Sequence, residues 1–274
     1  MKLLYTTDLH GNKDQYELVY GEAIKSKVQI IINGGDLLPI TNSDTIFKLQ
    51  GEFFKYLENH FRVFEEKKIY YLCFLGNDDL SIFDERFNRL CRNFEYVKNI
   101  AQRKIEINGY EFIGMSWIVD YPFRIKDRCR KDTKEYHIGI QYGTALRSTS
   151  NGFEEIDDWE SYVNQLPTIE DELNRLPRPE NMANAIYVIH MPPGNLGLDI
   201  CHDGCKAGSK AIHGFLLKNQ PPMSLHGHIH ESPEISGVWK SNIGKTICIQ
   251  PGQTGKLTYV MINLTNDKID RIQI

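Results

Sequence analysis

Short apolar runs and amphipathic stretches alternate over the first 75 residues, and this alternation constrains the fold more than any other feature. The apolar runs at 2–7, 28–33 and 69–75 predict strands, and the last run has the unbroken apolar character of a buried strand. Residues 13–26 and 45–67 carry apolar side chains at helical spacing, so they predict helices. The order strand, helix, strand, helix, strand is typical of an α/β fold with a largely parallel sheet.

The later part of the chain returns to sheet-forming patterns. Residues 104–119 predict a hairpin that turns at Asn108-Gly109, a strong turn signal. Further strands are predicted at 185–190 and 222–226. A short helix at 208–219 and several short strands within 235–274 complete the expected elements.

The segment at about 120–180 differs from the rest because it is polar, charged and irregular, with one helix predicted at 168–175. It has too few apolar residues to form a core of its own. We therefore interpret residues 1–274 as a single domain with an insertion or lid at about 120–180.

Composition excludes some classes of protein. The net charge of -4 does not support a general electrostatic attraction to nucleic acid. Six scattered cysteines in a chain rich in apolar residues favour a reducing compartment. The N-terminal apolar run is too short for a signal peptide, and no apolar stretch approaches the length of a membrane span. We therefore expect a cytoplasmic protein with no membrane partner.

Five polar clusters each follow directly after a predicted strand. In an α/β sheet, the ligand crevice lies beyond the carboxyl ends of the strands, which is where these clusters fall. Residues i and i+2 of an extended backbone point to the same side, so the first and last clusters can each direct two side chains to one place. The clusters are Asp8-Leu9-His10, Gly35-Asp36, Gly76-Asn77-Asp78, His190 and Gly227-His228-Ile229-His230.

The clusters combine carboxylate oxygens, imidazole nitrogens and an amide oxygen, without a thiolate. This set of donors is typical of sites that bind Mn, Fe or Zn through nitrogen and oxygen, and it differs from the cysteine ligands of a structural zinc site. Seven candidate ligands exceed what one tetrahedral ion needs, and a carboxylate that bridges two ions, most naturally Asp36, resolves the excess. Two ions about 3.5–4 Å apart can clamp the attacking and leaving oxygens of a phosphoryl displacement.

The order Asp-x-His, Gly-Asp, Gly-Asn, His, Gly-His-x-His resembles the calcineurin-like metallophosphoesterase family, with blocks running from residue 8 to residue 230. The stretch from Gly208 to Ser232 further resembles a prokaryotic subgroup described mostly as predicted phosphoesterases. The resemblance implies a four-layer αββα sandwich, two mixed β-sheets flanked by helices, and attack on phosphorus by a metal-bridging hydroxide. It implies one ion held by Asp8, His10, Asp36 and His230, and a second held by Asp36, Asn77, His190 and His228.

Asp78 departs from the family pattern. Many members read Gly-Asn-His here, and that histidine contacts the phosphate and can protonate the leaving group. An aspartate beside two cations should be ionised and would have no proton to give. Either another group supplies the acid or the substrates have good leaving groups. Asp78 and His137 are therefore the candidate catalytic residues. His137 could take the phosphate-binding or proton-donating role of the histidine that Asp78 replaces.

Several residues allow two interpretations. Asn12 could orient a metal ligand or could be a turn asparagine. His226 is interpreted as part of a strand, and Cys201-His202-Asp203-Gly204-Cys205 as a loop, because the spacing is not Cys-x-x-Cys. A basic run could be a solvated face or a lid over an anionic substrate, with the former favoured. The run comprises Arg124, Lys126, Arg128, Arg130, Lys131 and Lys134.

The sequence therefore predicts a dinuclear metal-dependent phosphoesterase acting on a small phosphorylated substrate, with phosphodiester or nucleotide-like compounds preferred. Two divalent ions are the expected cofactors, with Mn favoured and Fe, Zn or Ni compatible. One alternative is a non-catalytic scaffold of the same fold, although all seven ligand positions are filled. The other is a nuclease, which would need a longer basic groove, so nucleic acid stays an open partner. The oligomeric state is left open.

Overall fold

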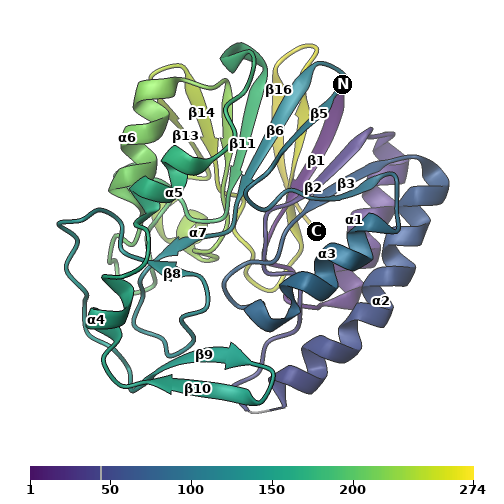
Figure 1. Cartoon of the computed structure of the whole chain (residues 1–274). Coiled ribbons are helices and arrows are strands. Elements are labelled where there is room, and N and C mark those ends of the chain that lie inside the picture. Colours follow the sequence, from purple (N-terminus) through teal and green to yellow (C-terminus); the bar gives the residue numbers. More distant parts are fainter. Residues whose placement is uncertain (44) are drawn as a thin grey trace.

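The computed structural model describes residues 1–43 and 45–274, and most of its strands form two six-stranded sheets (Figure 1). In the first sheet β1 to β4 run parallel, β15 pairs antiparallel with β1, and β16 pairs antiparallel with β15. The spatial order is β16-β15-β1-β2-β3-β4. Its strands are β1 (Lys2–Thr6), β2 (Ile30–Asn33), β3 (Tyr70–Cys73), β4 (Val97–Asn99), β15 (Thr258–Asn263) and β16 (Lys268–Gln273).

The second sheet is also mixed. Its four inner strands β6, β11, β12 and β14 are parallel, and β5 and β13 pair antiparallel at the two edges. The spatial order is β13-β14-β12-β11-β6-β5. Its strands are β5 (Lys104–Ile107), β6 (Tyr110–Met115), β11 (Ala185–Ile189), β12 (Met223–Leu225), β13 (Lys240–Ile243) and β14 (Thr246–Ile249).

Alternation along the strands places the sheets face to face. In β1, Leu3 and Tyr5 join a buried cluster that contains residues of both sheets, whereas Leu4 packs with the helices on the other side. The same alternation in β11 sends Val188 to the cluster between the sheets and Tyr187 to the outer cluster. Since successive side chains of a strand point to opposite faces, each sheet is buried on both of its faces.

Helices cover the outer face of each sheet and complete four layers (Figure 1). The expected αββα sandwich with two mixed sheets is therefore confirmed. The first sheet is covered by α1 (Lys13–Ser26), α2 (Ile46–Lys67) and α3 (Asp84–Arg92), and the second by α5 (Ile169–Arg175) and α6 (Lys210–Asn219).

The predicted helices and strands lie close to their expected bounds. Helix α1 coincides with the predicted 13–26, because Asn12 caps its start and Lys27 ends it in a left-handed conformation. Helix α2 begins one residue later than predicted, and β3 is shorter than 69–75. Helix α3, β4 and the short α7 (Ser232–Ser236) were not predicted.

The insertion packs against the body of the molecule instead of forming its own core. Trp159, Val163 and Leu173 belong to the buried cluster on the outer face of the second sheet. The predicted helix at 168–175 is confirmed by α5, whose first turn is held by a capping box between Thr168 and Asp171. The other elements around it are β7 (Ile118–Val119), β8 (Cys129–Arg130), β9 (Ala145–Thr149), β10 (Gly152–Ile156) and α4 (Trp159–Val163).

Two short 3₁₀ helices, Ser81–Phe83 and Met182–Asn184, complete the regular structure. Across the described ranges 1–43 and 45–274, none of the helices combines the length and apolarity that crossing a bilayer requires.

Candidate metal centre

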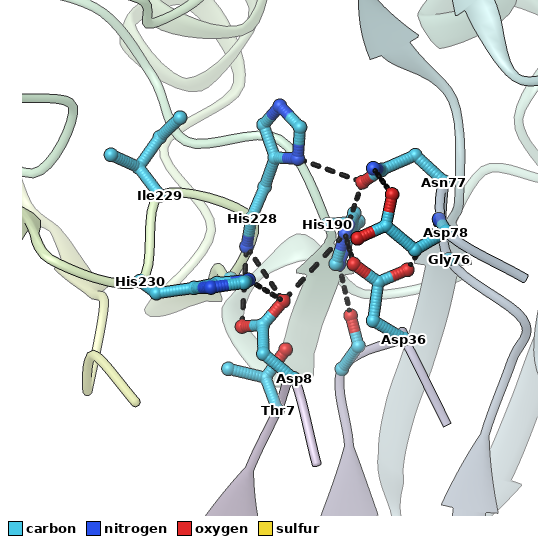
Figure 2. A network of polar contacts seen from close by, with 12 residues as sticks. Thr7, Asp8, Asp36, Gly76, Asn77, Asp78, His190, His228, Ile229 and His230 are labelled. Atoms are coloured by element: carbon cyan, nitrogen blue, oxygen red, sulfur yellow. Dashed lines mark hydrogen bonds and ion pairs between the residues drawn. The ribbon is translucent and has the colours of Figure 1, made fainter. Parts of the chain in front are cut away.

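The seven predicted ligands lie together at the carboxyl ends of strands from both sheets, and Figure 2 labels all of them except His10. Asp8, Asp36 and Asn77 follow β1, β2 and β3 of the first sheet, whereas His190 and His228 follow β11 and β12 of the second. Residues 220 positions apart in sequence, such as Asp8 and His228, are therefore in direct contact. The fold brings all five sequence clusters to one place.

Four of these residues form the first group of candidate ligands. One donor atom from each of the four lies within 4.8 Å of the others. The imidazole Nε2 atoms of His10 and His230 are 3.1 Å apart, and His230 Nε2 lies 3.4 Å from Asp8 Oδ1. Asp36 Oδ2 lies 3.9 Å from His10 Nε2. This group matches the first ion predicted from the resemblance.

The second group is built around the amide oxygen of Asn77. Asn77 Oδ1 lies 2.8 Å from His190 Nε2 and 2.7 Å from His228 Nδ1. His190 Nε2 also lies 3.3 Å from Asp36 Oδ2. The other ring nitrogen of His190 is 2.7 Å from the carbonyl oxygen of Gly34, an outer contact that fixes the ring orientation.

Asp36 connects the two groups. Its Oδ1 accepts a hydrogen bond from the Asp78 amide at 2.9 Å, whereas its Oδ2 is buried and has no hydrogen-bond partner within residues 1–43 and 45–274. A buried carboxylate oxygen without a partner is costly unless a cation satisfies it. Because Oδ2 faces His10 of one group and His190 of the other, the residues fit a bridging carboxylate between two cations.

The backbone leaves the strands sharply at these residues. Asp8, His10, Asp36 and His228 have φ values of 57°, 43°, 54° and 71°, in the left-handed region that non-glycine residues seldom adopt. Such conformations are costly and cluster at functional sites, where the surrounding structure holds them in place. Here they turn side chains at the strand ends toward a common centre.

Two glycines allow the close approach of these loops. A Cβ on Gly76 would collide with the carboxylate of Asp36, and a Cβ on Gly227 would lie 2.7 Å from Asp8 Oδ2. Both contacts are closer than real Cβ atoms show. Glycine is therefore required by space at both positions.

The two carboxylates are ionised because positive imidazoles lie beside them. Burial alone would raise the pKa of Asp36, but His190 and His10 and the Asp78 amide outweigh it, and the pKa is lowered. Burial likewise opposes ionisation of Asp8, whose pKa is lowered by His230 and His190. Asp8 and Asp36 therefore stay negatively charged although both are buried.

The histidines divide into two kinds. Burial would lower the pKa of His190, but Asp36 and Asp8 raise it to about 9. His230 behaves alike, since Asp8, Asp36 and Asp78 raise its pKa to about 9 against the effect of burial. Burial lowers the pKa of His10 and brings that of His228 to about 3. Without cations, protons on two histidines therefore balance the carboxylates.

Asp78 lies at the edge of the centre, where the predicted phosphate-binding residue should be. Its Oδ2 is 3.9 Å from His10 Nδ1, and its Oδ1 accepts a hydrogen bond from Asn77 Nδ2 at 2.9 Å. In the absence of cations, burial and the charge of Asp36 raise its pKa to about 7. Bound cations would act in the opposite direction, because nearby positive charge favours the ionised form.

Asp79 positions the loops without taking part in either ligand group, a role that the sequence analysis missed. Its carboxylate accepts hydrogen bonds from the amides of Leu37, Leu38 and Gly76 at 2.9, 2.7 and 2.8 Å. It therefore ties the loop after Asp36 to the loop that carries Asn77. Its position directly after Asp78 was the only available signal.

The interpretation of the basic run as a solvated face is wrong for half of it, because Lys126, Arg128 and Arg130 are buried, whereas Arg124 and Lys134 are exposed. Lys126 Nζ lies 2.8 Å from Asp120 Oδ1, with both side chains only 1% exposed. Arg130 lies over the ring of Trp117 at 3.8 Å and is 3.6 Å from Glu172 Oε1. These two cations and the buried Arg128 face partners within the protein, so they do not present free charge to a substrate.

Arg128 connects the insertion to the metal centre. Its Nε donates a 2.6 Å hydrogen bond to the carbonyl oxygen of Gly76, which precedes Asn77. Its Nη2 lies 2.5 Å from Asp84 Oδ1 and donates to the carbonyl oxygen of Asp79 at 3.5 Å. The guanidinium thus holds both ends of the 76–79 loop, which the composition of the run did not reveal.

Two further predicted site residues lie outside this network. His137 is exposed in the insertion, and no hydrogen bond or ion pair of the described chain joins it to the candidate ligands. The contact shown by the exposed Asn12 is the helix cap, in which its Oδ1 accepts from the Gln15 amide at 3.3 Å. His226 is buried directly after β12, one residue beyond the strand that was expected to include it, with Nδ1 3.0 Å from the carbonyl oxygens of Ile189 and Met191.

Tyr121 is a neighbour of the site that the sequence did not single out. Its ring centroid lies 5.9 Å from that of His228, and its hydroxyl donates to the carbonyl oxygen of Ile125 at 3.1 Å. Burial raises its pKa well above the usual value, with smaller contributions from Cys129, Asp78 and Asp36. An aromatic residue in a polar segment carries no periodic signal, so only the fold reveals its place.

The family assignment rests on this ordered set of ligands and on a match to a family model. The calcineurin-like phosphoesterase model matches residues 1–232, which is most of the chain. The chain belongs to the calcineurin-like phosphoesterase family. Membership supports a phosphoester hydrolase, and the Asp and His cluster fits the divalent metal site typical of the family. Among curated proteins, none matches the chain in sequence.

Solved structures share the fold over nearly the full length. A crystal structure of TT1561 of Thermus thermophilus is 16% identical, with 99% of this chain and 98% of that chain covered and a TM-score of 0.58. Another crystal structure is 17% identical, with the same coverage and a TM-score of 0.62. At this level of identity the likeness concerns the fold alone.

Proposed function

We propose that this chain hydrolyses phosphoester bonds at a centre that holds two divalent ions. The observation that carries the proposal is Asp36 Oδ2, a buried carboxylate oxygen without a hydrogen-bond partner in the described chain, placed between two groups of N and O donors. Asp8, His10 and His230 would complete one ion site, and Asn77, His190 and His228 the other.

The ions would supply positive charge to the attacking and leaving oxygens of an in-line displacement at phosphorus. The residues of the chain hold that charge in place. Asp79 fixes the two loops relative to each other, and the carbonyl oxygen of Gly34 fixes the ring of His190. A ligand set that is held before substrate arrives does not have to reorganise during the reaction.

Phosphodiester or nucleotide-like compounds are the proposed substrates, and Mn is the proposed ion, while the oxygen and imidazole donors are equally compatible with Fe, Zn or Ni. Hydrolysis of long nucleic acids is disfavoured, since Lys126, Arg128 and Arg130 are paired within the protein and the net charge is -4. A scaffold without activity is disfavoured because every ligand position is filled.

The test is an activity panel of chromogenic monoesters, chromogenic diesters and nucleotides, measured with added Mn, Fe, Zn or Ni. Wild-type protein should hydrolyse members of the panel, with diesters preferred. Asp36→Asn should lose activity by about 10³-fold or more, because removing the bridge forfeits several kcal/mol of charge stabilisation. Asp157→Asn, at an exposed site in the insertion, is the matched control and should retain activity. Equal activity in wild type and Asp36→Asn would contradict the proposal.

A further inference from the structure

Three aromatic rings lead from the candidate metal centre to the surface of the insertion. The ring of Tyr121 contacts that of His228, with centroids 5.9 Å apart. Phe123 follows, with its centroid 5.3 Å from that of Tyr121, and Tyr142 follows at 5.8 Å from Phe123. We call Tyr121, Phe123 and Tyr142 the aromatic rim. It begins at a candidate metal ligand and ends in solvent.

The outer two rings are unusually exposed for large aromatic residues. Phe123 is 58% exposed and Tyr142 is 63% exposed. Single exposed apolar residues need no explanation, but a contiguous aromatic surface beside a polar site marks a place where a ligand binds. The rings meet at interplanar angles of 65° and 85°, so neighbouring rings pack edge to face and do not stack face to face.

The rim is held in place by the backbone on both sides. The Tyr142 amide donates to the carbonyl oxygen of Pro122 at 2.8 Å, and the Leu146 amide donates to the carbonyl oxygen of Arg124 at 2.7 Å. Arg124 Nε also donates to the carbonyl oxygen of Thr144 at 3.1 Å. These hydrogen bonds join the segment that carries Phe123 to the segment that carries Tyr142, so the rings are positioned before a ligand binds.

We propose that the aromatic rim binds a planar aromatic group of the substrate, most simply the base of a nucleotide ester, while its phosphate lies at the metal centre. This inference rests on the proposed function, because it assigns the part of the substrate that does not react. Stacking on an aromatic side chain tolerates every base, since each has a π-face. Phe123 and Tyr142 are therefore positions that determine which phosphoesters are preferred.

The test compares two diesters with the same leaving group. One is the p-nitrophenyl ester of thymidine 5′-monophosphate, and the other is ethyl p-nitrophenyl phosphate, which has no base. Wild type should prefer the thymidine ester in kcat/KM. Phe123→Leu and Tyr142→Leu should each lower the ratio of the two kcat/KM values by about 5- to 150-fold, the range expected for loss of one stacked base.

Two controls separate stacking from apolar contact in general. Phe123→Tyr keeps a ring and should keep the ratio near that of wild type. Ile140→Ala removes a non-aromatic residue that is 84% exposed in the same segment, and it should also leave the ratio near wild type. An equal loss in Ile140→Ala would overturn the stacking proposal.

A second measurement does not depend on catalysis. Saturation-transfer NMR with thymidine 5′-monophosphate, without added Mn, should show the strongest transfer to the thymine protons, and the Phe123→Leu/Tyr142→Leu double variant should lose it. If the protein hydrolyses neither ester, the proposed function is contradicted, and the NMR result alone then tests base binding at the aromatic rim. If the protein is active but the variants leave the kcat/KM ratio unchanged and no saturation transfer to thymine is seen, only the aromatic-rim proposal is overturned. A change in sedimentation coefficient in the double variant, with unchanged ratios, would show a subunit contact and also overturn it.

Discussion

The candidate metal centre and the basic run of the insertion both bury charged side chains, but they differ in how those charges are satisfied. In the run, Lys126 pairs with Asp120 and Arg128 pairs with Asp84. In the centre, Asp36 Oδ2 has no hydrogen-bond partner among the residues that the structure describes. Buried charge with hydrogen-bonded partners within the protein indicates a structural role, whereas a buried carboxylate oxygen without a hydrogen bond, set among other candidate ligands, indicates a missing ligand.

The same difference explains why composition misled the interpretation of the run. Six basic residues within eleven positions look like a solvated or substrate-binding face when their partners are unknown. Three of the six are buried against carboxylates that lie up to 44 residues away in sequence and meet them only in the fold: Lys126 with Asp120, Arg128 with Asp84, and Arg130 with Glu172. Sequence clustering of charge therefore does not establish that the charge is free.

The largest expected effect concerns the pH dependence of metal binding at the centre. His190 and His230 have pKa values raised to about 9, so both are protonated at pH 7 in the metal-free protein. A metal ion binds neutral imidazole, so binding at pH 7 should release about two protons, and affinity should rise up to about 100-fold per pH unit between pH 6 and 8. The rise should flatten above pH 9.

Calorimetric titration with Mn at pH 7, in buffers with different ionisation enthalpies, measures the number of protons released. The slope of the observed enthalpy against buffer enthalpy should correspond to about two protons. A slope near zero would show that His190 and His230 are already neutral, and the charge contrast between the centre and the insertion would lose its basis.

The second prediction tests the structural role of the buried basic residues in the insertion by removing one of them. Arg128→Met should lower the free energy of unfolding by about 2–4 kcal/mol, because Asp84 and the Gly76 carbonyl lose a partner that is only 4% exposed. It should also weaken Mn binding by about 10- to 100-fold, because the Gly76 carbonyl adjoins Asn77. Chemical denaturation and metal titration measure the two effects.

Arg147→Met is the matched control within the same insertion. Arg147 is exposed and pairs with Glu154 at 2.7 Å. Exposed ion pairs contribute little to stability, so this variant should match wild type in both measurements. Equal effects of the two substitutions would mean that Arg128 has no special connection to the 76–79 loop.

The smallest effect is expected at Asp78, at the border of the centre. An ionised Asp78 cannot protonate a leaving group, so wild-type rates should depend steeply on leaving-group acidity, with nitrophenyl esters far ahead of alkyl esters. Asp78→His should speed alkyl esters by up to about tenfold, a fraction of typical general-acid help, and affect nitrophenyl esters less. Asp78→Asn should keep bound metal.

A leaving-group series on wild type and both variants measures this dependence. A flat dependence in wild type would reveal a proton donor, and His137, although exposed in this structure, would be the next residue to replace. Loss of metal in Asp78→Asn would instead mean that Asp78 is itself a metal ligand, and the assigned set of seven ligands would then be wrong.

The candidate ligands could be predicted because each lies at the end of a strand with a local apolar pattern. Asp8, Asp36 and Asn77 follow strands that periodicity alone identifies, and parallel pairing then brings them to one edge. Helix α1 was predicted to the residue from the helical spacing of its apolar side chains, and the structure adds that Asn12 caps its start. Local rules thus account for the strands and helices and for the place of the centre, whereas the four-layer sandwich and the division of the ligands between two ions came from the family resemblance.

The supporting contacts could not be predicted because they join residues distant in sequence. Arg128 meets the Gly76 carbonyl across 52 positions, and the ring of Tyr121 meets His228 across more than a hundred. The β9–β10 hairpin was missed because its strands, at 145–149 and 152–156, are half-exposed and carry little apolar alternation. Such features depend on tertiary packing, for which one sequence holds no periodic signal.

The number of ions that the centre holds tests the proposed two-ion site most directly. Wild-type protein and Asp36→Asn would be loaded with Mn, desalted and measured by elemental analysis, with Asp157→Asn as the control. We expect close to two ions per chain in wild type and in the control, and a clear loss in Asp36→Asn, since Asp36 Oδ2 faces both groups of donors. A wild-type value well below one ion per chain in fully active protein would contradict it.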